Sequence, residues 1–196
     1  MTTVLSDDVL DRVFRTARTA NGYTDQPVSE DQLHALWDLL KWGPTSANQM
    51  PLRITWCVSD EAKAKIAACT SGTNAAKILK APVTAILAMD MEFYEQLPKL
   101  FPHADARVWF VGNEKLIEES AFRNSTLQGA YFIVAARLLG LDTGPMSGLN
   151  PDAVNAAFFA GTTYKVNFIS TLGYADPASI HGRLPRLEFA DANQIL

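Results

Sequence analysis

Residues 41–53 read Lys-Trp-Gly-Pro-Thr-Ser-Ala-Asn-Gln-Met-Pro-Leu-Arg and join a predicted helix to a predicted strand. Gly43-Pro44 predicts the end of the helix, because glycine favours helix C-termini and proline cannot continue a helix. Four neutral polar side chains follow and offer hydrogen bonds without net charge; these are Thr45, Ser46, Asn48 and Gln49. Such a loop suits a flat ligand with an amide-rich edge. A surface turn closed by its own side chains fits it equally well.

The segments on both sides of this loop show clear periodicity. Ser29 and Gln32 match a capping box, and the apolar stripe that follows up to Leu40 predicts an amphipathic helix. The continuous apolar run over residues 83–89 is typical of a central strand. Further strands are predicted over residues 54–58 and 166–172, and further helices over residues 7–20, 60–68, 74–79 and 113–139 and after Asn150-Pro151. No linker or repeat is evident, so residues 1–196 are expected to form one α+β domain.

The composition indicates a globular protein. Of 196 residues, 48% are hydrophobic and 19% are charged, and a chain of this length can bury a sizeable core. The net charge of −4 argues against broad electrostatic attraction to nucleic acid or anionic lipid. Residues 127–139, in the second half of the long predicted helix, are apolar nearly all round. A helix segment of this kind belongs in a deep core or in a subunit interface.

The cysteines and the apolar stretches predict the compartment. Cys57 and Cys69 form no C-x-x-C pair, which indicates a reducing environment more than a disulfide framework. The N-terminus lacks a signal-peptide core. The longest apolar stretch, residues 130–141, is interrupted by Arg137 and is too short to span a bilayer. A cytoplasmic protein without a membrane segment is therefore expected.

Motifs of several enzyme classes are missing from the sequence. No G-x-G-x-x-G follows a predicted strand, so no resident Rossmann dinucleotide site is expected. Neither the P-loop pattern nor the G-x-S-x-G pattern of esterases occurs. His34, His103 and His181 lack metal-ligand spacing, so no metal site is predicted.

Three remote patches accompany the loop over residues 41–53. They are Arg18-Thr19-Ala20-Asn21, Asn74-Ala75-Ala76-Lys77, and Gly144-Pro145-Met146-Ser147-Gly148 followed by His181-Gly182-Arg183-Leu184-Pro185. Arginine guanidinium groups match phosphate oxygens bidentately, so Arg18 and Arg183 could grip a terminal phosphate. Taken singly, arginines such as these are more often solvated, and this alternative is kept for Arg15 and Arg186.

The order and spacing of these patches resemble the flavin-binding segments of the nitroreductase family, from about Phe14 to Phe189. Ala121-Phe122-Arg123-Asn124-Ser125 and the run from Gly140 to Gly148 further resemble its malonic semialdehyde reductase branch, also called 3-hydroxypropanoate dehydrogenase. The resemblance implies an α+β fold with a mostly antiparallel central sheet flanked by helices. It also implies an interlocked homodimer with FMN at the subunit interface.

The resemblance further implies which residues contact the flavin. Segments around Arg18, Asn74, Met146 and Arg183 would hold one FMN, while the loop from Pro44 to Asn48 would reach it from the other subunit. Asn74 and Lys77 would lie near flavin N1 and O2, where a cation stabilises the reduced ring; an ordinary polar helix face is the alternative. The full predicted set is Arg18, Thr19, Asn21, Pro44, Thr45, Ser46, Asn48, Asn74, Lys77, Pro145, Met146, Ser147, Gly148, His181 and Arg183.

The sequence departs from the wider family at three of these positions. Asn21 stands where many relatives have a second basic residue, and His181 stands where a lysine is common. Both changes reduce the positive charge around the predicted phosphate site. Ser147 replaces a frequent glutamate, which matters less because the family role at this position belongs mainly to backbone N–H groups.

The activity implied by the resemblance is reduction through the flavin. NADH or NADPH would bind transiently and leave, and the substrate would then stack in the same space, so that no side chain serves as a nucleophile. The branch implies reduction of malonic semialdehyde to 3-hydroxypropanoate in pyrimidine breakdown. A broad nitroaromatic or quinone reductase, a flavin-binding protein without turnover, and a purely structural dimer are the alternatives.

A short oxo-acid substrate needs a cation to orient its carboxylate, and two arginines are candidates. Arg107 lies in residues 91–112, an aromatic excursion that would serve either as a lid over the site or as a packed connector. Arg123 opens the apolar half of the long helix, where an unpaired buried charge would be costly. The alternative for Arg123 is a salt bridge at the subunit interface to a nearby carboxylate such as Glu118 or Glu119.

Overall fold

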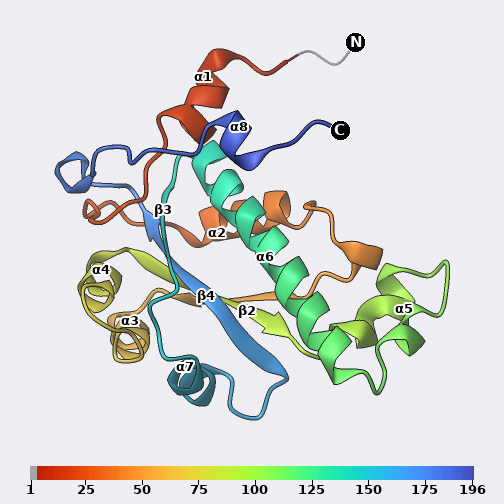
Figure 1. The fold of residues 1–196 in the computed structure, drawn as a ribbon. Coiled ribbons are helices and arrows are strands. Elements are labelled where there is room, and N and C mark those ends of the chain that lie inside the picture. The colour runs from red at the N-terminus through yellow and green to blue at the C-terminus, as the bar shows by residue number, and fades with distance from the viewer. Residues whose placement is uncertain (1–3) are drawn as a thin grey trace.

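The computed structural model describes residues 4–196 and is organised around one four-stranded sheet (Figure 1). The strand order is β1 (Leu52–Cys57), β2 (Val83–Asp90), β4 (Tyr164–Gly173) and β3 (Asp142–Met146). Each neighbouring pair is antiparallel. The predicted α+β class with an antiparallel central sheet is therefore confirmed.

Helices lie on both faces of this sheet (Figure 1). The α-helices are α1 (Asp7–Leu10), α2 (Glu30–Leu40), α3 (Asp60–Ala67), α4 (Asn74–Lys80), α5 (Leu97–Leu100), α6 (Glu114–Leu138), α7 (Pro151–Phe158) and α8 (Phe189–Ala192). Short helical turns complete the set: η1 (Asp11–Arg15), η2 (Ser46–Asn48), η3 (Phe93–Gln96), η4 (Ala106–Trp109) and η5 (Pro177–Ser179). The predicted capping box at Ser29 and Gln32 is present at the start of α2.

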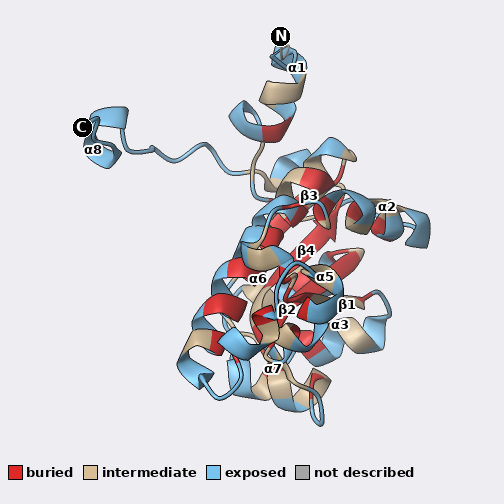
Figure 2. Cartoon of the chain, turned by 90° about the vertical axis from the view of Figure 1, so that its right-hand side faces the viewer, coloured by how far each residue is buried: buried red, intermediate tan, exposed pale blue. Residues whose placement is uncertain are grey.

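Strand β2 supplies the centre of the core because both of its faces are covered. Val83, Ala85 and Leu87 pack with residues of α2 and α6, whereas Ile86 and Ala88 pack with residues of α3, α4 and α7. All eight residues of β2 are buried, and Figure 2 shows buried segments of the sheet in red. This two-sided burial explains why the strand is a continuous apolar run in the sequence and does not alternate.

The first helix is shorter than the sequence predicted. Helical structure was expected over residues 7–20, but it ends at Arg15. The N–H and the hydroxyl of Thr16 both donate to Asp11 O, each at 2.9 Å, and this closes the last turn. The N–H of Ala20 then donates to Thr143 O at 3.0 Å, which draws the chain along β3 instead. Arg18 therefore lies in an extended segment beyond the helix.

Strand β3 was not predicted, because glycine and proline weaken a strand pattern. Its sequence is Asp-Thr-Gly-Pro-Met, and it pairs with β4 alone at one edge of the sheet. Proline is tolerated on an edge strand because its missing N–H can face the open side. Residues 142–146 thus form a strand in spite of Gly144 and Pro145.

The aromatic excursion is packed in this structure. Phe93, Leu97, Ala106 and Phe110 are buried in one cluster with residues of the first half of α6. The burial fits the packed connector better than a lid. The long helix itself, α6, begins after Asn113, whose side chain accepts from Leu116 N, and closely matches its predicted range.

Cys57 and Cys69 are both buried and form no disulfide. Burial raises the pKa of Cys57 to about 11. Among the helices of residues 4–196, none combines the length and the apolar character needed to cross a membrane.

Gly144 leaves no room for a side chain. A Cβ atom at this position would lie 2.8 Å from Ala20 O and would also overlap the Thr171 hydroxyl. Since a backbone oxygen cannot move aside without breaking the Ala20–Thr143 contact, we expect Gly144→Ala to lower the free energy of unfolding by roughly 1–3 kcal/mol. Urea denaturation measures this, with Gly182→Ala as the matched control because its Cβ would meet open space. Equal stability of the two variants would contradict the close approach.

Candidate functional site

Five of the predicted site residues line one cavity of about 450 Å³, which we call the arginine cavity. Arg18, Thr19 and Asn21 come from the segment after η1, and His181 and Arg183 come from the C-terminal tail. The remaining lining residues are Ala17, Arg137, Gly182, Leu184 and Arg186. None of the described residues that line this cavity is a carboxylate, while four are arginines. The cavity is therefore a cationic site suited to an anion.

Arg18 and Arg183 are oriented by the same stretch of backbone. Arg18 Nη1 donates to Thr16 O at 2.9 Å and to Ala17 O at 3.0 Å. Arg183 Nη2 donates to Arg15 O and, at 3.2 Å, to Ala17 O. Each guanidinium uses one nitrogen in these bonds, and a guanidinium carries five N–H donors. The remaining donors fit a phosphate group, which arginine binds bidentately.

Arg15 does not line this cavity. It donates to Asp7 at 2.7 Å and to Asp11 at 3.0 Å. These hydrogen bonds raise the pKa of Arg15. Arg186, which was also left out of the predicted set, lines the arginine cavity but donates to the nearby Leu184 and Pro185 carbonyls.

Arg137 is a cavity residue that the sequence did not assign. Burial lowers its pKa, nearby Asp142 opposes this effect, and Arg183 adds to it. Its Nη1 donates to Val13 O at 2.7 Å, which ties α6 to η1. The sequence signal that could have identified Arg137 is that it is the only charged residue in the apolar half of the long helix, residues 127–139.

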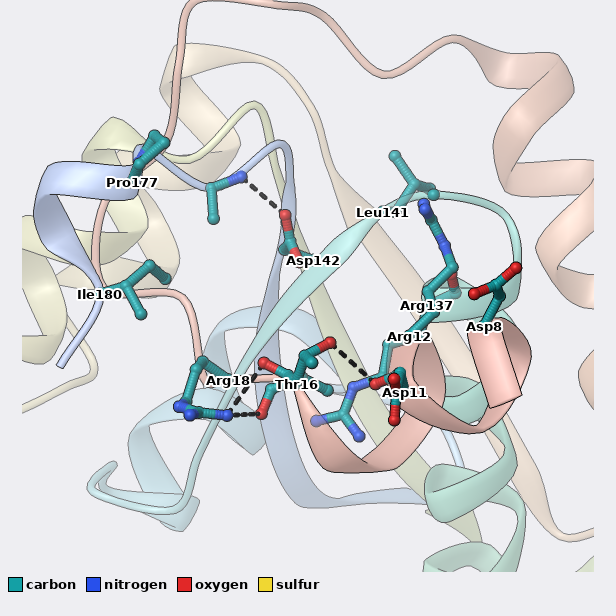
Figure 3. Close-up of a pocket in the computed structure, with 13 residues that line it drawn as sticks. Asp8, Asp11, Arg12, Thr16, Arg18, Arg137, Leu141, Asp142, Pro177 and Ile180 are labelled. Atoms are coloured by element: carbon teal, nitrogen blue, oxygen red, sulfur yellow. Dashed lines mark hydrogen bonds between the residues drawn. The ribbon is translucent and has the colours of Figure 1, made fainter. Parts of the chain in front are cut away.

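Arg18 and Arg137 also line a neighbouring cavity of about 540 Å³ (Figure 3). Three carboxylates line this second cavity, namely Asp8, Asp11 and Asp142. Their negative charge opposes anion binding there. An anion would consequently favour the arginine cavity.

A second group of predicted residues meets where β3 ends and α4 begins. Asn74 Nδ2 donates to Gly148 O at 3.1 Å. A Cβ at Gly148 would lie 2.6 Å from the same amide nitrogen, so glycine permits this close approach. Pro145 and Met146 end β3, Ser147 lies between β3 and Gly148, and Lys77 lies one helical turn beyond Asn74. We call these residues the amide group.

Strand β3 connects the arginine cavity to the amide group. Ala20, next to Thr19, is bonded to Thr143 near the start of the strand, and Ser147 follows its last residue. Five residues of antiparallel strand span roughly 14–17 Å. The arrangement therefore suits an elongated molecule with a phosphate at one end and a flat ring at the other.

The third predicted group, the loop with Pro44, Thr45, Ser46 and Asn48, lies elsewhere in the subunit. Ser46 N donates to Asn124 Oδ1 of α6 at 2.8 Å, and Asn48 Nδ2 donates to Leu100 O at the end of α5 at 2.9 Å. In Figure 1 this orange segment and α4 lie on opposite sides of α6. Within one subunit the loop is thus not joined to the amide group.

The two candidate carboxylate anchors are in different environments. Arg107 makes a bidentate pair with Glu95, with both N–O distances at 2.7 Å. These bonds raise the pKa of Arg107 and lower the pKa of Glu95. Arg123 is exposed on α6 and, within residues 4–196, has no salt bridge; Glu119 pairs instead with Lys115 at 4.0 Å. A salt bridge of Arg123 across a subunit interface stays a prediction, because it would form with a second copy of the chain.

A fold with these features and a cationic cavity at the edge of an antiparallel sheet defines a class of cofactor-binding α+β proteins. The chain matches the Nitroreductase family over residues 14–174 and belongs to this family. It is 56% identical to a Burkholderia lata protein provisionally named NADH dehydrogenase/NAD(P)H nitroreductase, over 98% of this chain and 99% of that protein. A Stenotrophomonas maltophilia protein with the same kind of name is 53% identical over the full length of both chains.

Solved structures support the same fold. The crystal structure of ydfN of Bacillus subtilis, a protein provisionally named a nitroreductase, aligns with a TM-score of 0.85 at 18% identity and covers 97% of this chain and 100% of that one. An Exiguobacterium sibiricum protein with the same provisional name, in complex with FMN, aligns with a TM-score of 0.84 at 21% identity over the full length of both chains. These structures confirm the predicted nitroreductase-like fold. The family match and the named relatives confirm the oxidoreductase class.

Proposed function

We propose that this protein is a homodimeric, FMN-dependent NAD(P)H oxidoreductase. The observation that carries the proposal is the placement of the arginine cavity and the amide group at the two ends of β3. The FMN bound to the Exiguobacterium sibiricum protein and the names of the Burkholderia lata and Stenotrophomonas maltophilia relatives support the same cofactor and reductant.

The chain's own residues bind and orient the cofactor in this proposal. Arg18 and Arg183 hold the phosphate through charge-assisted hydrogen bonds. The Asn74 amide and the Lys77 ammonium would lie beside the ring, where a positive charge would favour the reduced, anionic form. Thr19, Asn21 and His181 complete the polar wall of the arginine cavity. Bound FMN supplies the redox chemistry, accepting a hydride from NADH or NADPH and donating it to the substrate.

A second copy of the chain completes the site. The loop with Ser46 and Asn48 lies across α6 from the amide group of its own subunit, so it reaches a flavin only on a neighbouring one. The exposed apolar side chains of α6 support such an interface: Phe122 is 54% exposed, Leu127 46%, Tyr131 42% and Leu138 49%. Burying these side chains against a partner would release ordered water and favour association.

The substrate in this proposal is malonic semialdehyde, which the motif Ala121–Ser125 supports through the branch resemblance. Arg107 would hold the carboxylate of this short oxo-acid, and Arg123 is the second candidate. In this structure Arg107 binds the carboxylate of Glu95 with two hydrogen bonds, so a substrate carboxylate would replace Glu95 as its partner. A broad nitroaromatic or quinone reductase is the second candidate function, favoured by the names of the relatives.

The first prediction concerns cofactor identity. We expect the purified protein to be yellow and to release FMN, and not FAD, on denaturation, because the arginine cavity offers one phosphate site. Absorbance spectra and chromatography of the released flavin measure this. A colourless protein that takes up no added FMN would overturn the proposed function.

The second prediction concerns the phosphate. Arg18→Ala and Arg183→Ala should each weaken FMN binding by about one to two decades, since a lost charge-assisted hydrogen bond costs roughly 1.5–3 kcal/mol. Arg15→Ala is the matched control, because Arg15 pairs with Asp7 and Asp11 outside the cavity. Fluorescence titration gives the affinities, and equal values in all three variants would exclude the assignment.

The third prediction separates the two substrate classes. Arg107→Ala should lower kcat/KM for malonic semialdehyde much more than kcat/KM for an uncharged quinone, because only the former carries a carboxylate. Glu95→Gln serves as the control that breaks the same ion pair and keeps the cation. An equal loss for both substrates in Arg107→Ala would favour the broad reductase.

A further inference from the structure

The loop that follows α2 is held in a conformation that its residues rarely adopt. Ala47, Asn48 and Met50 have positive φ angles of 50°, 51° and 43°. None of them is glycine, and in this region the Cβ atom lies close to the following carbonyl oxygen. Such a conformation persists only where the surroundings fix it more strongly than the strain opposes it.

Buried side chains hold the backbone of Ser46 on both sides. Its N–H donates to Asn124 Oδ1 at 2.8 Å, and its carbonyl accepts from Gln49 Nε2 at 2.9 Å. Gln49 is fully buried, and Asn124 is 2% exposed. The Ser46 peptide groups are therefore fixed by side-chain amides from two different segments, while the Ser46 residue itself remains exposed.

Ser120 of α6 joins these two amides into one network, which we call the loop clamp. Its hydroxyl donates to Gln49 Oε1 at 3.0 Å, and its carbonyl accepts from Asn124 Nδ2 at 2.9 Å. Ser120 and Asn124 lie one turn apart on the same face of a 25-residue helix, which is a rigid base. Each member of the clamp is hydrogen-bonded to another member, so the position of the Ser46 backbone depends on the position of α6.

The chemistry of the clamp indicates more than packing. A buried polar side chain is unfavourable unless it is hydrogen-bonded, and an apolar residue would fill the same volume without that constraint. A network of three buried polar side chains that fixes an exposed, strained loop is typical of a preorganised binding segment. The clamp also binds the loop that contains Ser46 and Asn48, two residues that the resemblance predicted to contact a flavin.

We propose that Gln49, Ser120 and Asn124 are positioning residues for FMN, which hold Ser46 and Asn48 in the geometry that receives the cofactor of the neighbouring subunit. This inference rests on the proposed function. None of the three needs to touch FMN, because each acts through the backbone of the loop. Preorganisation raises affinity by removing the cost of ordering the loop when the cofactor binds.

The experiment compares two buried serines of α6. Ser120→Ala removes the bond to Gln49, whereas Ser125→Ala removes bonds to Phe122 O and Asn167 Nδ2 that do not involve the loop. We expect Ser120→Ala to raise the Kd for FMN about fivefold, the scale of one net hydrogen bond. It should also speed hydrogen exchange of the Ser46 amide in the FMN-bound protein. Ser125→Ala should leave both unchanged, even if it lowers stability.

A conservative variant and the wild type complete the test. Ser120→Thr retains the hydroxyl and should restore the wild-type Kd and the protection of the Ser46 amide. An unchanged Kd in Ser120→Ala, or an equal loss in Ser125→Ala, would overturn this inference alone, provided that the wild type binds FMN. A wild type that binds no FMN would overturn the proposed function and this inference with it.

Discussion

The hydrogen bond from Ala20 N to Thr143 O, at 3.0 Å, joins the segment behind the first helix to the edge strand β3. The proposed site depends on this contact, because it sets Arg18 and Thr19 at a fixed distance from Ser147 and Gly148. The contact in turn requires Gly144, since any side chain there would overlap Ala20 O. Tyr23 also ties this segment to the sheet, because its hydroxyl donates to Thr171 Oγ1 of β4 at 2.7 Å. The absence of a side chain at Gly144 therefore allows the segment after the first helix to approach β3.

Electrostatics then select between two adjoining cavities. Both are lined by Arg18 and Arg137, but only one of them also contains Asp8, Asp11 and Asp142. The three carboxylates neutralise the arginines of the neighbouring cavity, while the arginine cavity keeps its positive charge. A cluster of arginines in a cavity that no carboxylate lines is unfavourable for folding because like charges repel. The bonds from Arg18 and Arg183 to backbone carbonyls offset this repulsion, and a bound anion would relieve it further.

The long helix α6 serves both the core and the loop. Its Gln128 is fully buried and accepts from Leu52 N at 3.0 Å, which fixes the start of β1. One to two turns earlier, Ser120 and Asn124 fix the strained loop that precedes β1. The same helix therefore positions both the edge strand β1 and the polar loop that is proposed to reach a second subunit. Its exposed apolar side chains, such as Leu127 and Tyr131, face outward from this framework.

Sequence periodicity by itself determined the elements whose burial pattern is local. The continuous apolar run of β2, the capping box at Ser29 and the length of α6 could all be predicted, because side chains a few residues apart encode them. Motif resemblance also predicted five of the ten residues that line the arginine cavity. Tertiary structure alone decided the end of the first helix at Arg15, the strand at Gly144-Pro145 and the roles of Arg137, Ser120 and Gln49. Most of these features depend on partners that are distant in the chain: β3 pairs with β4, Ala20 N donates to Thr143 O, and Ser120 donates to Gln49. Local propensity does not encode such contacts.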